Sequence, residues 1–177
     1  MPLGIWATRH VNLAQYVINA VGALRLIPSL AILFLALPYL GTGFGPALIA
    51  LTVLALPPVL INVYAGILSV DRAVVESARA MGMTPRQQLL QVELILALPA
   101  IIAGVRTAAV EVISSATLAA LIGAGGLGIF ITRGFAIFEP RIMLVGAIPV
   151  AVLALMSEVI LGSVERWLSP AQRSRAS

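Results

Sequence analysis

A charged, helix-forming segment at residues 71–93, here called the charged elbow, separates stretches that are almost wholly apolar. Its charged side chains are Asp71, Arg72, Glu76, Arg79, Arg86 and Glu93. No charged residue occurs from position 26 to position 70. A helix that crosses a membrane needs about 20 mainly apolar residues, and the stretches on both sides of the elbow reach that length. Because charged groups are costly in lipid, the elbow must project into water.

The composition also indicates a membrane protein. Of 177 residues, 60% are hydrophobic and 10% are charged, whereas soluble domains average about 25% charged residues. The net charge of +4 does not indicate nucleic-acid binding, because the arginines are scattered at the ends of apolar runs without interleaved aromatics. There is no cysteine and one histidine. We therefore expect no metal site, no cofactor and no catalytic residues, and we expect a transport subunit rather than an enzyme.

The chain is predicted to be all-α and to cross the membrane several times. About four spans are expected, at residues 13–40, 46–66, 94–122 and 142–164. Arg25 and Pro28 interrupt the first, so that residues 13–24 are alternatively a separate short helix at the interface. We expect a single transmembrane domain over residues 1–177, with the charged elbow as a loop inside it.

Arginine placement predicts the orientation. Arginines gather in the charged elbow, after residue 165 and before the first span, whereas Arg133 and Arg141 lie between the last two spans. Since cytoplasmic loops carry the excess of basic residues, both termini and the elbow are expected in the cytoplasm.

The elbow contains well-formed signals for helix ends. Asp71 is a good N-cap for a helix over residues 72–81. Gly82 follows where a helix C-terminus favours a left-handed residue. Thr84 and Gln87 match a capping box that starts a second helix, which runs into the third span.

The first elbow helix also has a feature that suits binding to another protein. Ala78 and Gly82, four residues apart, are expected to form a narrow smooth face onto which a partner's surface closes. An ordinary cytoplasmic loop with good caps is the alternative interpretation.

The elbow resembles the EAA loop of permease subunits of ATP-binding-cassette (ABC) importers. The pattern is met by Glu76-Ser77-Ala78, by Gly82 and by residues 92–95. Ser77 departs from the pattern's alanine, and Ile95 from its proline, which predicts a straighter entry into the third span. The resemblance implies a coupling helix docked on an ATPase subunit, and it makes the following contact or shape-setting residues: Glu76, Ser77, Ala78, Gly82 and Met83.

Further segments resemble the glycine betaine/choline/carnitine, or osmoprotectant, branch of that family. They are residues 26–31, 104–108, 116–128 and 165–170. The methionine importers share residues 123–128 and are the nearest alternative. Relatives usually carry one more helix at the front, and residues 2–10 resemble its tail, so we expect that the chain starts late.

The resemblance implies a fold, a place and partners. The fold is that of a type I ABC importer permease in the cell membrane of a bacterium. The implied partners are ATPase subunits, an extracytoplasmic solute-binding protein and a second permease subunit. Two interpretations from other classes stay open: a secondary transporter driven by an ion gradient, which would need buried ion-coupling groups and usually an internal repeat, and a membrane scaffold that does not transport.

Residues 123–128 satisfy the G-x-G-x-x-G pattern of dinucleotide-binding proteins. That mechanism needs a βαβ unit and an acidic residue about 20 positions further on, and neither is present. We interpret the glycines as a permissive external turn after the third span. The resemblance places them near the side where a binding protein docks: Gly123, Gly125, Gly126 and Gly128. A flexible connector is the alternative.

Several polar residues fall inside the predicted spans, where they should face protein or a water-filled route. Arg106 and Glu111 lie about 140° apart around one helix, so they are poor partners for each other. Arg106 alternatively extends to the interface, and Glu158 is expected to pair structurally. The candidates for a translocation path are Asn62, Glu111, Ser114, Ser115 and Thr117; cross-helix hydrogen bonding is their alternative role.

Overall fold

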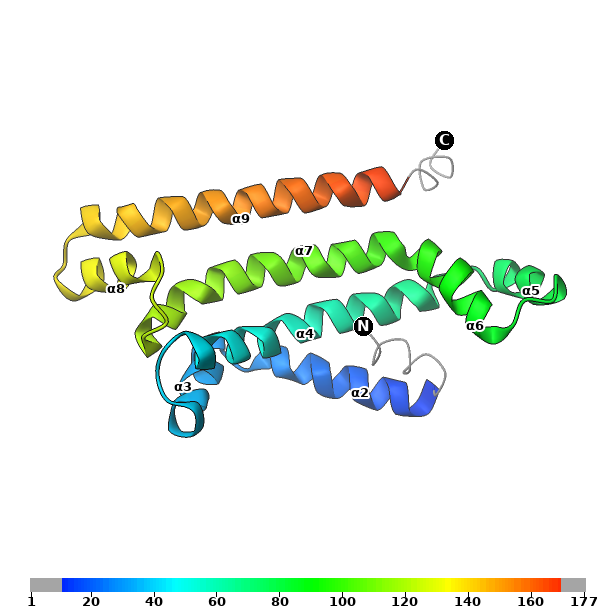
Figure 1. The fold of residues 1–177 in the computed structure, drawn as a ribbon, viewed down its shortest axis with the longest axis horizontal. Helices are drawn as coiled ribbons and strands as arrows, with labels where there is room; N and C mark the ends of the chain where they lie inside the picture. The colour runs from blue at the N-terminus through cyan, green and yellow to red at the C-terminus, as the bar shows by residue number, and fades with distance from the viewer. Residues whose placement is uncertain (1–10, 170–177) are drawn as a thin grey trace.

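The computed structural model describes residues 11–169, which are helical almost throughout and contain no strand within that range. Figure 1 shows long helices that lie roughly side by side, with shorter helices at both ends of the molecule. In chain order the helical elements are α2 (Val11–Ala23), η1 (Leu24–Leu26), α3 (Ser29–Leu40), α4 (Phe44–Leu68), α5 (Arg72–Ala80), α6 (Pro85–Gln88), η2 (Leu89–Glu93), α7 (Leu94–Leu118), η3 (Ala119–Ile122), α8 (Gly128–Ala136) and α9 (Pro140–Leu168).

Helix α7 is the centre of the bundle. It packs along α4 on one side and along α9 on the other, while α2 and α3 pack on α4, and α8 packs on α9. The elbow helices α5 and α6 lie at the same end of the molecule as the C-terminal end of α9, and α8 lies at the opposite end (Figure 1). The elbow and the C-terminal end of α9 therefore lie on the same side of the bundle.

Three of the about four predicted spans are confirmed, and the first needs correction. Within residues 11–169, three helical stretches are long and apolar enough to cross a membrane: Phe44–Leu68, Pro85–Ile122 and Pro140–Leu168. The stretch predicted as a first span, residues 13–40, is divided into α2 and α3, because the chain leaves the α-helix from Leu24 to Pro28. The separate short helix that Pro28 predicted is therefore confirmed, although neither piece alone has the length of a span.

Small residues set the distance between α4 and α7. A Cβ placed on Gly104 would lie 2.6 Å from the Cβ of Asn62 and 3.0 Å from the carbonyl oxygen of Pro58. A Cβ placed on Gly66 would lie 2.8 Å from that of Ala100. Interfaces between membrane helices are enriched in small residues for this reason, since van der Waals packing drives their association.

Gly104→Ala is therefore expected to destabilise the α4–α7 pair by about 1–3 kcal/mol, the usual cost of overpacking. Thermal unfolding in detergent, followed by gel filtration, measures the effect. Gly45→Ala is the matched control, because Gly45 is also helical but has no atom within 4 Å of an added Cβ. Equal melting temperatures for the two variants would contradict the packing argument.

Candidate functional site

The charged elbow folds as its capping signals predict. The carboxylate of Asp71 accepts a hydrogen bond of 2.9 Å from the backbone N–H of Ala73 and so begins α5. Gly82 has φ +83°, in the left-handed region. Thr84 and Gln87 form the capping box that begins α6, with Gln87 Oε1 accepting from the Thr84 N–H at 2.8 Å. The sequence therefore specifies the reversal of the chain between the two elbow helices by local means.

The expectation for Ala78 was wrong in part. Its side chain is only 2% exposed, so it packs inside the elbow and offers no face to a partner. Gln88, which sequence analysis missed, is 4% exposed, and its Nε2 donates a hydrogen bond of 2.8 Å to the Met83 carbonyl oxygen. The buried amide therefore ties the start of the second elbow helix to the turn after Gly82. In the sequence, the only sign of this role is that a glutamine occurs inside the amphipathic segment.

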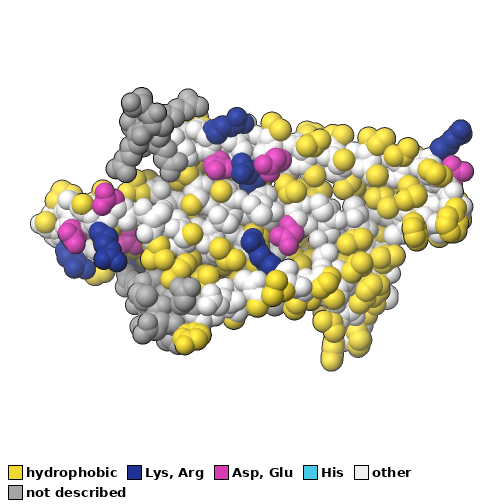
Figure 2. Space-filling model, turned by 180° about the vertical axis from the view of Figure 1, so that it is seen from behind, with side chains coloured by type: hydrophobic (Ala, Val, Ile, Leu, Met, Phe, Trp, Pro, Cys, Tyr) yellow, Lys and Arg dark blue, Asp and Glu magenta, His cyan; other side chains and the backbone are white. Residues whose placement is uncertain are grey.

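The other predicted contact residues lie in α5 and in the turn that follows it. Glu76, Ser77 and Gly82 are exposed, and Met83 is half-buried. Met81 is 77% exposed and adds an apolar side chain to this region. Figure 2 shows acidic and basic side chains gathered at the end of the molecule that the elbow forms, and in smaller groups along a surface that is otherwise mostly hydrophobic or uncharged.

A cleft of about 310 Å³ lies where α5 meets the ends of α4 and η2. Its charged lining residues are Arg72, Glu76, Arg79 and Glu93. Among residues 11–169 none of these four is in an ion pair. The cleft therefore presents both signs of charge at the place where the elbow meets the long helices.

The junction between the elbow and the third span is a π-helical turn, η2. Isoleucine in place of proline at position 95 predicted a straighter entry into the third span than the family pattern implies. The π-helical turn, which ends at Glu93, was not predicted. Such turns are rare and frequently lie at functional sites. From α6 to η3 the chain stays helical across this turn and past Pro99, as the sequence predicted.

Three of the five candidate path residues lie together. Glu111, Ser114 and Ser115 line a cavity of about 240 Å³, here called the charged cavity. Pro57 of α4 and Arg25 of η1 line the same cavity, and the role of Arg25 was missed by sequence analysis. Sequence analysis treats Arg25 only as an interruption of a span, since nothing local indicates that it lines one cavity with a glutamate 86 positions later.

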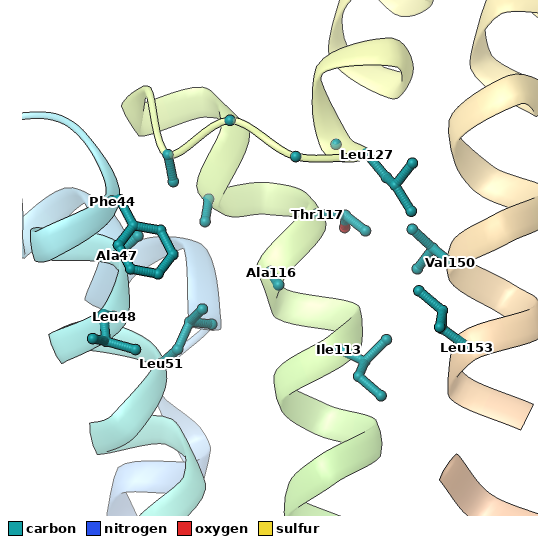
Figure 3. Close-up of a pocket in the computed structure, with 15 residues that line it drawn as sticks. Phe44, Ala47, Leu48, Leu51, Ile113, Ala116, Thr117, Leu127, Val150 and Leu153 are labelled. Atoms are coloured by element: carbon teal, nitrogen blue, oxygen red, sulfur yellow. The ribbon is translucent and has the colours of Figure 1, made fainter. Parts of the chain in front are cut away.

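The other two candidates lie elsewhere. The amide of Asn62 donates a 2.8 Å hydrogen bond to the Pro58 carbonyl oxygen within α4. Thr117 donates to the Ser114 carbonyl oxygen at 2.7 Å and lines a separate, mostly apolar cavity of about 300 Å³. Figure 3 shows that cavity between α4, α7 and α9, with Phe44, Leu127 and Leu153 around it.

The glycine segment forms the end wall of this apolar cavity. Gly125, Gly126 and Gly128 line it, and Gly123 has φ +81° directly after η3. Gly128 abuts the Thr117 carbonyl oxygen so closely that an added Cβ would collide with it. A close-packed turn after the third span is confirmed by this geometry. Docking of a binding protein there stays a prediction.

An ion-pair cluster joins α7 to α9. Arg106 Nε lies 3.4 Å from Glu158 Oε1, and Arg106 Nη1 lies 3.0 Å from Glu165 Oε2. The two glutamates are about two turns apart on one face of α9, with Gly162 between them. The structural pairing expected of Glu158 is confirmed, and Arg106 and Glu111 are not partners. Glu165 was missed.

The described residues, 11–169, contain no group of three or more His, Asp or Glu side chains that could hold a metal ion. Most of their charged side chains instead lie in the elbow, the charged cavity and the Arg106 cluster. His10 lies outside the described residues. The geometry thus offers a water-exposed elbow joined to a membrane-length rod, and a polar cavity beside that rod.

Comparison with known proteins identifies relatives over nearly the whole chain. Residues 1–170 match the model of the family described as "Binding-protein-dependent transport system inner membrane component". The chain is 48% identical to the carnitine transport permease protein OpuCB of Listeria monocytogenes, over 96% of this chain and 78% of that protein. It is 42% identical to the choline transport system permease protein OpuBB of Bacillus subtilis, over 99% of this chain and 81% of that protein.

A solved structure shares the fold. An inward-facing structure of the MetNI methionine ABC transporter matches with a TM-score of 0.85, over 95% of this chain and 85% of that chain, at 23% identity. At that identity the match supports the architecture and not the solute. The resemblance to the osmoprotectant branch is confirmed by the sequence relatives.

Proposed function

Because the chain belongs to the family of inner membrane components of binding-protein-dependent transport systems, we propose that it is the permease subunit of an ABC importer for osmoprotectants. Its solutes would be small quaternary amines such as carnitine, choline or glycine betaine. The observation that carries this proposal is the identity of 48% and 42% to permeases for carnitine and for choline. A methionine importer has only the likeness of fold in its favour.

The charged elbow supports a role in energy coupling. It is a water-exposed pair of short helices, and α6 continues through η2 into α7. A force applied to α5 by an ATPase subunit would therefore reach α7, which packs on both α4 and α9. Glu76, Ser77, Gly82 and Met83 would form or shape the contact surface, and Ala78 would shape the elbow from inside.

The remaining parts of the complex follow from this role. A second permease subunit would complete the pathway, because three membrane-length helices from one chain enclose little space. An extracytoplasmic binding protein would deliver solute at the end that carries the glycine segment. The elbow and the C-terminal end of α9 would then face the cytoplasm, in agreement with the arginine distribution.

Uptake in vesicles tests this proposal against the secondary transporter. With the chain reconstituted beside its ATPase and binding protein, uptake of labelled carnitine or choline should require internal ATP and survive a protonophore. Uptake that persists without ATP and stops with the protonophore would show an ion-driven transporter. A chain that neither binds an ATPase nor supports any uptake would be the scaffold of the third interpretation.

A further inference from the structure

The charged cavity holds two opposite charges that the protein leaves unpaired. Within residues 11–169, neither Arg25 nor Glu111 is in an ion pair, although both line the same cavity. The contrast with Arg106 is informative, because that arginine lies within 3.4 Å of a carboxylate. A charge at membrane depth is retained only where it faces protein or a water-filled route. The cavity therefore keeps both charges available to a ligand.

The depth of the cavity suits a position on the pathway. Glu111 lies eleven residues before the end of η3, about 16 Å along the helix from that end. It is thus well inside the helical stretch Pro85–Ile122, away from both of its ends. Ser115, one turn further along α7, is 5% exposed and lines the same cavity.

Two serines that line the cavity differ in what they offer a ligand. Ser114 donates its hydroxyl hydrogen to the Val110 carbonyl oxygen at 2.9 Å. In the described part of the chain Ser115 Oγ makes no such bond. The cavity of about 240 Å³ is large enough for a small solute, since one water molecule occupies about 30 Å³ of liquid.

We propose that the charged cavity is a transient binding site for a zwitterionic quaternary amine, in which Glu111 faces the ammonium group and Arg25 faces the carboxylate. This inference rests on the proposed osmoprotectant function. Carnitine and glycine betaine carry both charges, at opposite ends of a short chain. An arginine can bind a carboxylate through two parallel hydrogen bonds. Choline carries the ammonium group but has a hydroxyl in place of the carboxylate, so it would engage only Glu111.

The residues that line the charged cavity also suit a site that binds the solute weakly and releases it. Among residues 11–169 no aromatic side chain lines the charged cavity, and an aromatic cage is the usual tight site for a quaternary ammonium. The ammonium group is therefore held by the charge of Glu111 alone. A site on a pathway must be favourable enough to enter and weak enough to leave.

Parallel uptake of carnitine and choline tests the assignment in the reconstituted full complex. Arg25→Gln is expected to lower carnitine uptake about tenfold relative to choline uptake, the scale of one lost hydrogen bond to a charged group. Glu111→Gln is expected to lower uptake of both solutes. Arg25→Lys should restore part of the carnitine uptake, because it keeps the charge but not the two parallel hydrogen bonds of the guanidinium. Arg133→Gln, at an exposed position on α8, is the control and should leave both uptakes unchanged.

The outcomes separate this inference from the function on which it rests. Co-purification with the ATPase subunit shows which variants assemble, and only assembled variants are compared. If the wild type takes up both solutes and Arg25→Gln lowers them equally, or lowers neither, the assignment of Arg25 to a carboxylate is overturned while the osmoprotectant function stands. If the wild type takes up choline but no zwitterion, that assignment also falls. If it takes up no quaternary amine, the proposed function fails and the inference fails with it.

Discussion

Replacing Gly82 with valine is expected to abolish most uptake while ATP hydrolysis by the partner subunit continues. Gly82 has φ +83°, a conformation that costs an ordinary residue about 1–2 kcal/mol and makes a β-branched residue an outlier. The turn would open or shift, and α5 would no longer be held in its position relative to α6. The measurement is the ratio of solute imported to ATP hydrolysed in proteoliposomes, which should fall about tenfold.

A matched variant separates backbone strain from contact with the partner. No atom lies within 4 Å of a Cβ added at Gly82, so within this chain the cost of a side chain is conformational. Asparagine tolerates the left-handed region, and Gly82→Asn should therefore keep most coupling if the backbone is what matters. If Gly82→Asn and Gly82→Val are equally defective, a partner surface closes directly on this position. Normal coupling in both variants would contradict any role for the elbow turn.

The elbow could be predicted from the sequence because its signals are local. Asp71, Gly82 and the Thr84–Gln87 pair each act on backbone groups within a few residues, so their effect does not depend on the rest of the fold. The interruption near Pro28 is local in the same sense. The prediction of a span at residues 13–40 was wrong at that interruption. The two short helices α2 and α3 together have the apolar length of one span, and the sequence alone suggested a single helix.

The features that sequence analysis missed are set by packing between distant segments. Helical periodicity predicts which residues share a face of α7, but it does not say which neighbouring helix lies against that face. Arg25 meets the cavity of Glu111, and Arg106 meets Glu165, through the positions of η1 and α9 in the bundle. The burial of Ala78 depends in the same way on how the elbow folds back. Spacing along α7 did show that Arg106 and Glu111 are poor partners.

Arg106→Met is expected to prevent stable assembly of the permease. Arg106 lies within 3.4 Å of Glu158 and 3.0 Å of Glu165, and its removal leaves two carboxylates, about two turns apart on α9, without the cation. On the insertion scale a charge at the membrane centre costs about 2.5–3.5 kcal/mol. The three side chains are 26% to 48% exposed in the isolated chain, so the penalty for these positions should be smaller, on the order of 1 kcal/mol per carboxylate. The measurement is the yield and melting temperature of the purified subunit in detergent.

Neutralising all three side chains of the cluster should restore part of the stability that Arg106→Met removes. Replacing a complete ionic cluster by neutral groups is often tolerated, whereas breaking it by removing one partner is costly. The triple variant Arg106→Met, Glu158→Gln, Glu165→Gln is therefore expected to be more stable than Arg106→Met alone. Arg141→Met is the control, because Arg141 is exposed at the start of α9 and is in no ion pair with any residue of 11–169. If the triple variant is no more stable than Arg106→Met, the loss comes from the packing of the arginine stem over Gly162, and not from the carboxylates left without a cation.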